Sequence, residues 1–182
     1  NSVWNGYGGG VYVYHAMPEI RDCLIANNRV GVNGISAGGG GIYLGQSAGI
    51  LLNSSVLASN YTARSSVDEG SGLSSGLEDG DRISYVRVFN CLVVSNYAPA
   101  GAGVTISYNI VGDPGKSYVE SCTFVSNANA GLRIVNATVP VSNSVFWGHA
   151  DDISYNNGIA TLTYDDIPNE TLIGTIGCVT GD

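Results

Sequence analysis

Five acidic residues in one Ser- and Gly-rich stretch are the first candidates for chemistry. They lie between residues 61 and 81 and are Asp68, Glu69, Glu78, Asp79 and Asp81. Carboxylate oxygens are ligands that Ca²⁺ prefers in proteins, so they are candidate metal ligands. Their spacing matches neither the EF-hand loop nor the nonapeptide calcium repeat. We therefore interpret 61–81 as a solvated loop and expect no cofactor, with Ca²⁺ as the alternative.

Carboxylates are also the residues that would cleave a polysaccharide. Hydrolysis of a glycosidic bond needs two carboxyl groups roughly 5–9.5 Å apart. Glu120 and Asp165 occupy one position of the repeat described below, and the residues expected beside Glu120 at that position are Phe89 and Ser142. Asp165 likewise has Ser142 as its expected neighbour. Neither acid has an acidic partner, so we assign no catalytic residue and favour a protein that is not an enzyme.

Aromatic residues offer a second kind of chemistry. Tyr12 and Tyr43 stand between inward apolar residues at equivalent positions, and we expect them to stack on the outer surface. An exposed aromatic strip could bind sugar rings, which makes both tyrosines glycan-binding candidates; ordinary cross-strand packing is the alternative. His15 and His149 are expected far apart, and we interpret His149 as structural.

The cysteines do not form a zinc motif. Cys23, Cys91, Cys122 and Cys178 include no Cys-x-x-Cys pair, which argues against a metal centre. We expect Cys91 and Cys122 to lie one repeat apart, near the strand spacing of about 4.8 Å. Parallel Cβ vectors disfavour the disulfide torsion, so buried thiols are favoured and a Cys91–Cys122 bridge is the alternative. Cys23 is expected to be free.

A repeat that runs along most of the chain positions these residues. Its best copy is Ser121-Cys122-Thr123-Phe124-Val125-Ser126-Asn127. A small residue stands at the Cys122 position, here called column zero, followed two residues later by a large apolar residue. The column-zero residues are Cys23, Ser55, Cys91, Cys122 and Ser144. Five residues after column zero come Asn28, Asn60, Asn96 and Asn127, and then His149. We expect these asparagines to form a stacked amide ladder, with the cysteines also serving the scaffold.

The spacing of apolar residues predicts three short strands in each repeat. Alternation with period two flanks column zero, and the short polar residue before it marks a corner. A third strand has the form Gly, apolar, any, apolar and begins at Gly10, Gly41, Gly103 and Gly131. Three strands per unit describe one coil of a parallel β-helix. The shortest units are Ser2 to Cys23, Cys122 to Ser144 and Ser144 to Ile167, and longer units hold loops at 61–81 and 107–117.

The charge and composition of the chain argue against some classes of binding partner. The chain has 182 residues and a formal net charge of −8, with 7 Lys and Arg against 15 acids. Nucleic acid and anionic lipid need clustered cations, so we expect neither as a partner. No run of eighteen apolar residues occurs, so we expect no membrane insertion. We interpret residues 1–182 as one domain whose chain starts and ends within a coil.

Two half-motifs resemble a known family. Phe124-Val125-Ser126-Asn127 matches a Phe-x-x-Asn half-motif, and Gly39-Gly40-Gly41-Ile42 is similar to a Gly-Gly-Ala-Ile half-motif. Both are typical of the polymorphic outer-membrane-protein repeats, among the right-handed parallel β-helix surface and secreted proteins of bacteria. The resemblance implies an all-β, right-handed three-sided parallel β-helix of about six to seven coils, in an extracellular or cell-surface location.

The leading functional hypothesis is a non-catalytic structural or adhesive β-helix. Its partners would be further copies joined end-to-end into a filament, or the neighbouring coils of a longer surface solenoid. A polysaccharide lyase or hydrolase, or a glycan-binding module, is the alternative. Four glycosylation sequons occur, at Asn53, Asn60, Asn136 and Asn169, and several are expected by chance in a chain rich in Asn, Ser and Thr. Asn60 is a predicted ladder residue and should not be modified, and Asn136 and Asn169 are the candidate sites.

Overall fold

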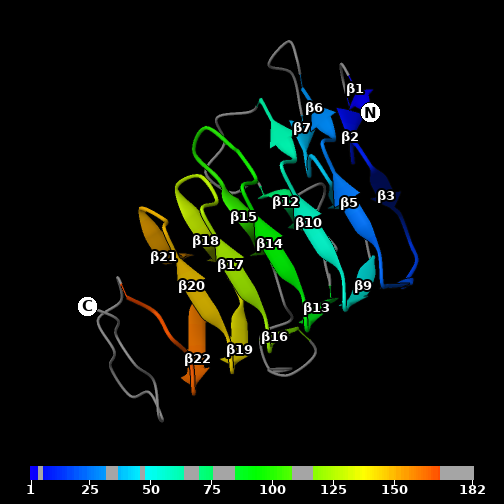
Figure 1. Cartoon of the computed structure of the whole chain (residues 1–182). Coiled ribbons are helices and arrows are strands. Elements are labelled where there is room, and N and C mark those ends of the chain that lie inside the picture. Colours follow the sequence, from blue (N-terminus) through cyan, green and yellow to red (C-terminus); the bar gives the residue numbers. More distant parts are fainter. Residues whose placement is uncertain are drawn as a thin grey trace.

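The protein folds as a coil of parallel β-strands stacked along one axis (Figure 1). The computed structural model describes residues 1–3, 6–31, 37–45, 48–63, 70–75, 85–107 and 117–168. Within these ranges neighbouring strands pair in parallel, as in the pairings of β10 with β14, β13 with β9 and β18 with β21. These ranges contain no helix, and so none that could span a membrane. The all-β prediction is confirmed.

Three sheets form the sides of the coil, numbered here in the order in which the chain enters them. Side 1 consists of β3 (Val11–Val13), β8 (Ile42–Leu44), β12 (Gly70–Ser75), β15 (Ala102–Ser107), β18 (Ala130–Val135) and β21 (Asp151–Asn156). Side 2 consists of β4 (Glu19–Arg21), β9 (Gly49–Asn53), β13 (Tyr85–Phe89), β16 (Tyr118–Glu120), β19 (Thr138–Ser142) and β22 (Ile159–Thr163). Side 3 consists of β5 (Leu24–Ala26), β10 (Val56–Ala58), β14 (Leu92–Val94), β17 (Thr123–Val125) and β20 (Val145–Trp147).

Two shorter sheets link side 3 back to side 1 in the first coils. One contains β1 (Ser2–Val3), β6 (Arg29–Val30) and β11 (Tyr61–Thr62), and the other contains β2 (Gly6–Tyr7) and β7 (Ala37–Gly38). Sides 1 and 2 each have six strands. The described residues therefore form six coils, in agreement with the predicted three-sided architecture.

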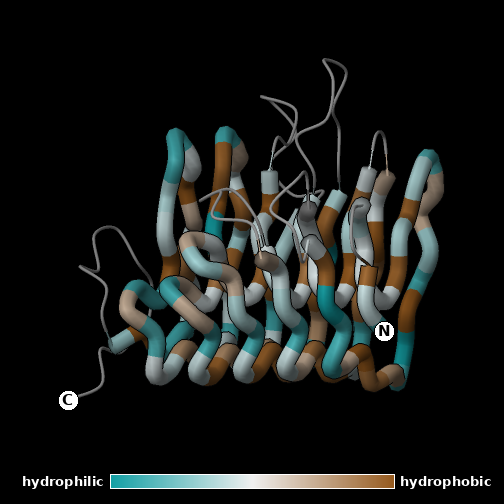
Figure 2. The backbone as a smooth tube through the Cα atoms, turned by 90° about the horizontal axis from the view of Figure 1, so that it is seen from above, coloured by the Kyte–Doolittle hydropathy of each residue, from teal (hydrophilic) through white to brown (hydrophobic). Residues whose placement is uncertain are grey.

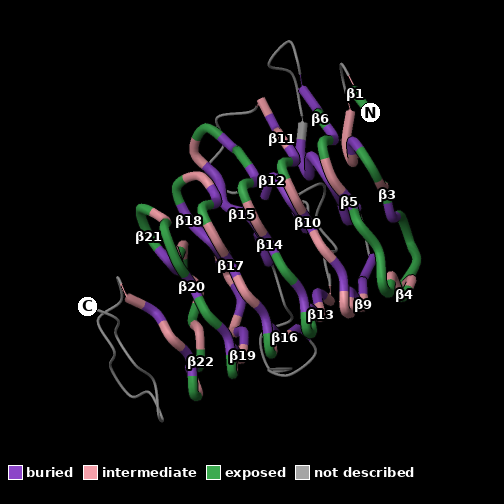
Figure 3. Tube along the Cα trace, in the orientation of Figure 1, coloured by how far each residue is buried: buried purple, intermediate pink, exposed green. Residues whose placement is uncertain are grey.

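Buried residues recur along the strands of all three sides (Figure 3), and apolar segments recur from coil to coil (Figure 2). The interior is filled by one apolar residue from each strand of side 3 and by matching residues of sides 1 and 2. On side 3 these are Ile25, Leu57, Val93, Phe124 and Phe146, which align across the sheet. Phe124 and Phe146 are fully buried and stack with ring centroids 4.6 Å apart. Burial of a large apolar side chain contributes about 1.5–3 kcal/mol, so these stacked columns supply the main stabilising term.

Each strand of side 3 lies between two single-residue corners in the left-handed backbone region. The corner before column zero has φ of 46–54° at Asp22, Ser54, Asn90, Ser121 and Asn143. The second corner follows the strand, with φ of 51–57° at Asn27, Ser59, Ser95 and Ser126 and 74° at Gly148. The short polar residue before column zero is therefore a bend, as the repeat predicts.

The predicted asparagine ladder is present. Asn28, Asn60 and Asn96 each donate from Nδ2 to Oδ1 of the next ladder residue, at 3.0–3.1 Å. The same Oδ1 atoms accept the backbone N–H of the preceding ladder residue. At the last rung the N–H of Asn127 donates to Nδ1 of His149 at 3.1 Å. His149 therefore takes the place of an asparagine as an acceptor, which confirms its structural role.

The ladder explains the glycine at or near the start of the first five strands of side 1. A Cβ added at Gly103 would lie 2.7 Å from Cγ of Asn127, and one at Gly131 would lie 2.8 Å from Nε2 of His149. Gly10, Gly41 and Gly72 meet the other ladder side chains in the same way, at 2.8–3.2 Å. Glycine is needed here because the ladder side chains lie directly against the backbone.

Column zero forms a second ladder, through backbone N–H groups. The N–H of Cys23 donates to Oγ of Ser55 at 3.1 Å, and the N–H of Cys122 donates to Oγ of Ser144 at 3.2 Å. Each hydroxyl or thiol in turn donates to the carbonyl two residues earlier, as in Ser144 to the carbonyl of Ser142. Column zero is therefore limited to short side chains that can both accept and donate.

The prediction that Ile167 occupies column zero of the last coil is wrong, because Asp165 does. The N–H of Ser144 donates to Oδ1 of Asp165 at 2.8 Å, and the N–H of Thr163 donates to Oδ2 at 2.9 Å. Asp165 is 1% exposed. Burial raises the pKa of its carboxyl, and the two N–H donors oppose that rise. Ile167 instead fills the inward apolar column beyond Phe146.

The first coil also differs from its predicted register. Ser2 pairs with Arg29 rather than with a column-zero residue, and the carbonyl of Asn1 accepts the N–H of Arg29. Asn1 thus lies at the ladder end of the coil. The predicted repeat unit from Ser2 to Cys23 is therefore wrong. The sequence suggested it because Asn1-Ser2-Val3 resembles Asn143-Ser144-Val145.

The predicted loop at 61–81 is too long. Its first two residues form β11, and residues 70–75 form β12, which is buried and pairs with β8 and β15. The predicted loop at 107–117 is shorter as well, because Ser107 ends β15 and Ser117 is buried beside β13. The remaining residues of both loops lie outside the described ranges.

Candidate functional site

The outer surface of side 3 is apolar over its whole length. In each of its strands the middle residue is buried and the first and third residues face outward. The outward residues are Leu24, Ala26, Val56, Ala58, Leu92, Val94, Thr123, Val125, Val145 and Trp147. We call this set the apolar strip. Outward positions of a solvated sheet are ordinarily polar, so a strip with Thr123 as its one hydroxyl residue needs an explanation.

Several side chains of the apolar strip are open to solvent. Leu24 is 70% exposed, Trp147 54%, Val145 38% and Leu92 37%. The strip follows the strand register as two columns, so that Leu92 lies between Val56 and Thr123. A parallel sheet with about 4.8 Å between strands carries these columns over roughly 24 Å.

Polar residues border the apolar strip along both long edges. The left-handed corners supply them, with Asn90 and Ser121 along one edge and Ser59 and Ser95 along the other. Asp166 pairs with Val145 and places a carboxylate at the end of the strip nearest β22. An apolar centre with a polar rim is the anatomy of a protein contact surface.

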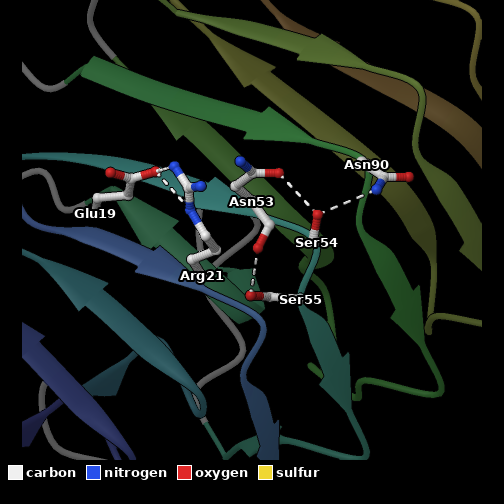
Figure 4. A network of polar contacts seen from close by, with 6 residues as sticks. All are labelled: Glu19, Arg21, Asn53, Ser54, Ser55 and Asn90. Atoms are coloured by element: carbon white, nitrogen blue, oxygen red, sulfur yellow. Dashed lines mark hydrogen bonds and ion pairs between the residues drawn. The ribbon is translucent and has the colours of Figure 1, made fainter.

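Side 2 gives the contrast, because its outer surface mixes charged and polar side chains with apolar ones such as Phe89 and Ile159. Glu19 and Arg21 form an exposed ion pair at its first strand (Figure 4). At the adjoining corner Nδ2 of Asn90 donates to Oγ of Ser54 at 3.1 Å, and Ser54 donates to Oδ1 of Asn53 at 3.0 Å. Side 3 therefore differs from side 2 in that no charged side chain interrupts its outward apolar columns.

A ladder of stacked aromatic side chains flanks the apolar strip beyond its second corner. Tyr61 and Tyr97 stack with centroids 5.5 Å apart and planes 4° apart. The guanidinium of Arg29 lies 4.4 Å over the ring of Tyr61. Tyr61 is thus in contact with both Arg29 and Tyr97, and Tyr97 is 49% exposed.

The predicted stacking of Tyr12 and Tyr43 is observed, with ring centroids 5.8 Å apart. Tyr43, however, is only 2% exposed, and its other neighbour Tyr7 stacks at 4.3 Å. Tyr43 therefore lacks the open ring face that sugar binding requires, and its assignment as an exposed residue is wrong. Tyr12 is 49% exposed and stays a glycan-binding candidate.

The other predicted site residues are placed apart or lie outside the description. Asp68, Glu69, Glu78, Asp79 and Asp81 fall outside the described residues, so the calcium hypothesis stays a prediction. In the part of the chain that is described, no group of three His, Cys, Asp or Glu side chains could hold a metal. Glu120 has Phe89 and Ser142 as neighbours, as predicted.

The cysteines that the structure describes are thiols. Cys91 and Cys122 are buried neighbours one coil apart, and the N–H of Cys91 donates to Sγ of Cys122 at 3.4 Å. A hydrogen bond with the Cys91 thiol and burial raise the pKa of Cys122, which keeps it protonated. Cys23 is exposed and free, as predicted. Cys178 lies outside the described residues.

The two predicted glycosylation sites remain predictions. Asn136 is half-buried at a left-handed corner with φ of 47°, and Asn169 lies outside the described residues. Asn60 is fully buried and donates Nδ2 to the carbonyl of Ile25 at 2.8 Å. Its side chain has no access for a glycan, in agreement with the sequence argument.

Comparison with known families agrees with this geometry. The family described as "Right handed beta helix region" matches residues 1–168. The chain belongs to this right-handed β-helix family. No curated protein and no solved structure matches the chain. Membership of the β-helix family fixes the winding and the stacked coils, whereas the narrower resemblance to outer-membrane-protein repeats stays a prediction.

The sequence argument missed the apolar strip, although a signal was present. The strands Leu24–Ala26, Leu92–Val94 and Val145–Trp147 are apolar at all their positions. A half-buried strand alternates, and a strand buried on both faces reads as a continuous apolar run. The continuous runs in this β-helix therefore indicated a second covered face.

Proposed function

We propose that this β-helix is a non-catalytic adhesive scaffold that binds through the apolar strip. The observation that carries the proposal is the outward columns of side 3, where Leu92 and Val94 stand in the centre of an uncharged surface with a polar rim. A contact of this kind gains free energy from the apolar area removed from water, about 25 cal/mol per Å². Rigid stacking of the coils keeps the surface preformed, which limits the entropy lost on binding.

We place the scaffold outside the cell or at its surface. The half-motif resemblance supports this location, as does a composition with only 12% charged residues. The sequence that flanks the chain in its parent gene tests the location. A secretion leader or a surface anchor there supports it, and a fusion to a cytosolic enzyme contradicts it.

Adsorption to chemically defined surfaces tests the binding function. Leu92→Ser and Phe89→Ser form a matched pair, because both side chains face outward and are 37% and 36% exposed. We expect the wild type and Phe89→Ser to adsorb on a methyl-terminated surface in a quartz microbalance, and Leu92→Ser to adsorb several-fold less. Equal adsorption of all three proteins would contradict the proposal.

End-to-end stacking is a second proposal, supported by the open strand edges. In the described residues β3, β4 and β5 form one edge of the three sides, and the other edge consists of β21, β22 and Asp166, which pairs with Val145 of β20. Unpaired parallel edges template further strands, supplied by a longer chain or by another copy. Electron microscopy of the pure chain tests this, because filaments of one coil's width support stacking and isolated particles contradict it.

A glycan-binding function is the third proposal, and Tyr12 supports it through its exposed ring. A glycan array with wild type and Tyr12→Ser is the test, because a signal that survives the substitution places binding elsewhere. A polysaccharide lyase or hydrolase is the enzymatic alternative, tested by turnover of acidic and neutral glycans with and without Ca²⁺. Turnover that Asp79→Ala abolishes would replace the scaffold proposal with that enzyme.

A further inference from the structure

We infer that the partner of the apolar strip is a second copy of this chain, packed face to face on side 3 with its coils in reversed order. The inference rests on the proposed function, because it names the occupant of the same surface. Three features of the described residues carry it: the distribution of side-chain size along the strip, the distribution of charge and the extent of the surface.

Side-chain size changes systematically along the column that ends at Trp147. The column begins with Ala26 and Ala58, continues with Val94 and Val125, and ends with the large ring of Trp147. This column is therefore shallow at the first coil and raised at the last, whereas the other column begins with Leu24, which is 70% exposed. A flat partner would leave a gap over the alanines, and interfaces gain affinity only from close packing.

A two-fold axis that lies over the central strand β14, between the two copies, matches small residues with large ones in this column. If the axis runs parallel to the strands, Trp147 of one copy lies over Ala26 of the other, and Val125 lies over Ala58. Leu92 and Val94 then meet their own counterparts at the axis. Such an isologous contact uses one surface twice and closes, so it gives a dimer and not an open polymer.

Charge does not oppose a contact at the apolar strip itself. The chain carries a formal net charge of −8, so two copies repel one another in general. The apolar strip itself contains no ionisable side chain, and Glu19, Arg21 and Glu120 lie on side 2. Association through the strip should therefore strengthen as salt screens the net charge. A contact built on ion pairs would weaken instead.

The extent of the surface sets the expected affinity. The strip with its two rims covers about 24 Å along the axis and about 16–20 Å across it, which gives roughly 400–500 Å². Stable complexes of standard size bury about 800 Å² per partner. We therefore expect a weak dimer, with a Kd in the micromolar to millimolar range.

Sedimentation velocity over a concentration series tests the dimer. We expect the sedimentation coefficient of the wild type to rise with concentration, and to rise at lower concentration when NaCl is added. Leu92→Glu places two like charges at the axis and should leave a monomer at every concentration. Phe89→Glu adds the same charge on side 2 at equal exposure and should dimerise like the wild type.

A size exchange tests the reversed order of the coils. Ala26→Phe fills the shallow end of the column that ends at Trp147 and should weaken the dimer at least ten-fold, because the new ring meets Trp147 of the other copy. The double variant Ala26→Phe with Trp147→Ala should recover most of the affinity. A dimer whose coils run in the same order would place Ala26 over Leu24, and Trp147→Ala would then rescue nothing.

The outcomes separate the inference from the function on which it rests. A wild type that stays monomeric at millimolar concentration, or Leu92→Glu that dimerises as well as Phe89→Glu, overturns the inference. Thermal unfolding of each variant by circular dichroism shows that its monomer is folded. If the methyl-surface adsorption still depends on Leu92 in that case, the scaffold function stands without the self-contact.

Discussion

Truncation of one rung of the asparagine ladder should be among the most damaging single changes in this protein. Oδ1 of Asn96 accepts the N–H and Nδ2 of Asn60, while its Nδ2 donates to the carbonyl of Leu57 and to Oδ1 of Asn127. Asn96 is 1% exposed. Asn96→Ala removes these four hydrogen bonds from the interior and leaves the backbone N–H of Asn60 without its acceptor.

The magnitude follows from these contacts. A buried donor left without a partner costs about 1–3 kcal/mol, and a net hydrogen bond contributes about 0.5–1.5 kcal/mol. Nδ2 of Asn60 keeps its bond to the carbonyl of Ile25, and Oδ1 of Asn127 keeps the N–H at position 96. Only some of the groups that contact Asn96 therefore lose every hydrogen-bond partner. We expect Asn96→Ala to lower the free energy of unfolding by about 3–5 kcal/mol.

Urea denaturation followed by circular dichroism and by tyrosine fluorescence is the measurement. Two probes are needed because a repeat array can unfold one coil at a time. Asn53→Ala is the matched control, since Asn53 is half-buried on side 2 and accepts one bond from Ser54 at 3.0 Å. We expect the control to cost less than about 1 kcal/mol. Equal losses in the two variants would refute the assignment of the ladder as a principal source of stability.

Three further substitutions test the glycine column, one corner and column zero. Gly103→Ala should lower stability by about 1–3 kcal/mol in thermal unfolding, because its Cβ would lie 2.7 Å from Cγ of Asn127; an unchanged melting temperature would contradict this. Tyr164→Asn should raise stability by about 0.5–1 kcal/mol, because Tyr164 holds φ of 57° at a corner where other coils have Asp, Ser or Asn; a loss would show that the tyrosine makes a compensating contact. Burial raises the pKa of Asp165 above 3.8, so its contribution is complete below pH 3.8 and is lost as pH rises through the raised pKa. The difference in the free energy of unfolding between wild type and Asp165→Ser should therefore shrink with rising pH. A difference that grows with pH would contradict a raised pKa for Asp165.

The sequence predicted the winding of the chain and its ladders because each coil repeats one structural solution. Asn60, Asn96 and Asn127 have the same neighbours in successive coils, so one copy explains the others. The glycine column, by contrast, was recognised as a pattern and not explained. Its cause is the contact between Gly103 and the Asn127 side chain, which requires the third dimension.

The register of the last coil was missed although the repeat contains the signal for it. A large apolar residue stands two positions after column zero, and Ile167 meets this rule only when Asp165 is column zero; with Ile167 at column zero the residue two positions later is Asn169. A shift of two residues keeps every side chain on its side of a strand, so alternation alone does not separate the two registers, and the hydrogen bond from Ser144 to Asp165 agrees with the apolar column. Strand β12 was missed because Gly70–Ser75 has Leu73 as its one large apolar residue.

The candidate site was predictable in part. The alternation of residues along the strands predicted that the side chains of Tyr12 and Tyr43 point outward, and this prediction was right. Exposure was not predictable, because Tyr43 is covered by its neighbours in space. The apolar strip was within reach of sequence reasoning, since Leu92–Val94 reads as a strand with two covered faces.

The ladder keeps its geometry while the length of the chain between its rungs varies. Successive ladder residues are 32, 36, 31 and 22 positions apart, yet the bonds at each rung measure 3.0–3.1 Å. The contacts of the ladder therefore stay constant, while the number of residues between two ladder positions is free to change. Inserted peptides of ten or more residues should be tolerated between ladder residues. Peptides inserted at equivalent positions of successive coils would then be held one strand separation apart, about 4.8 Å.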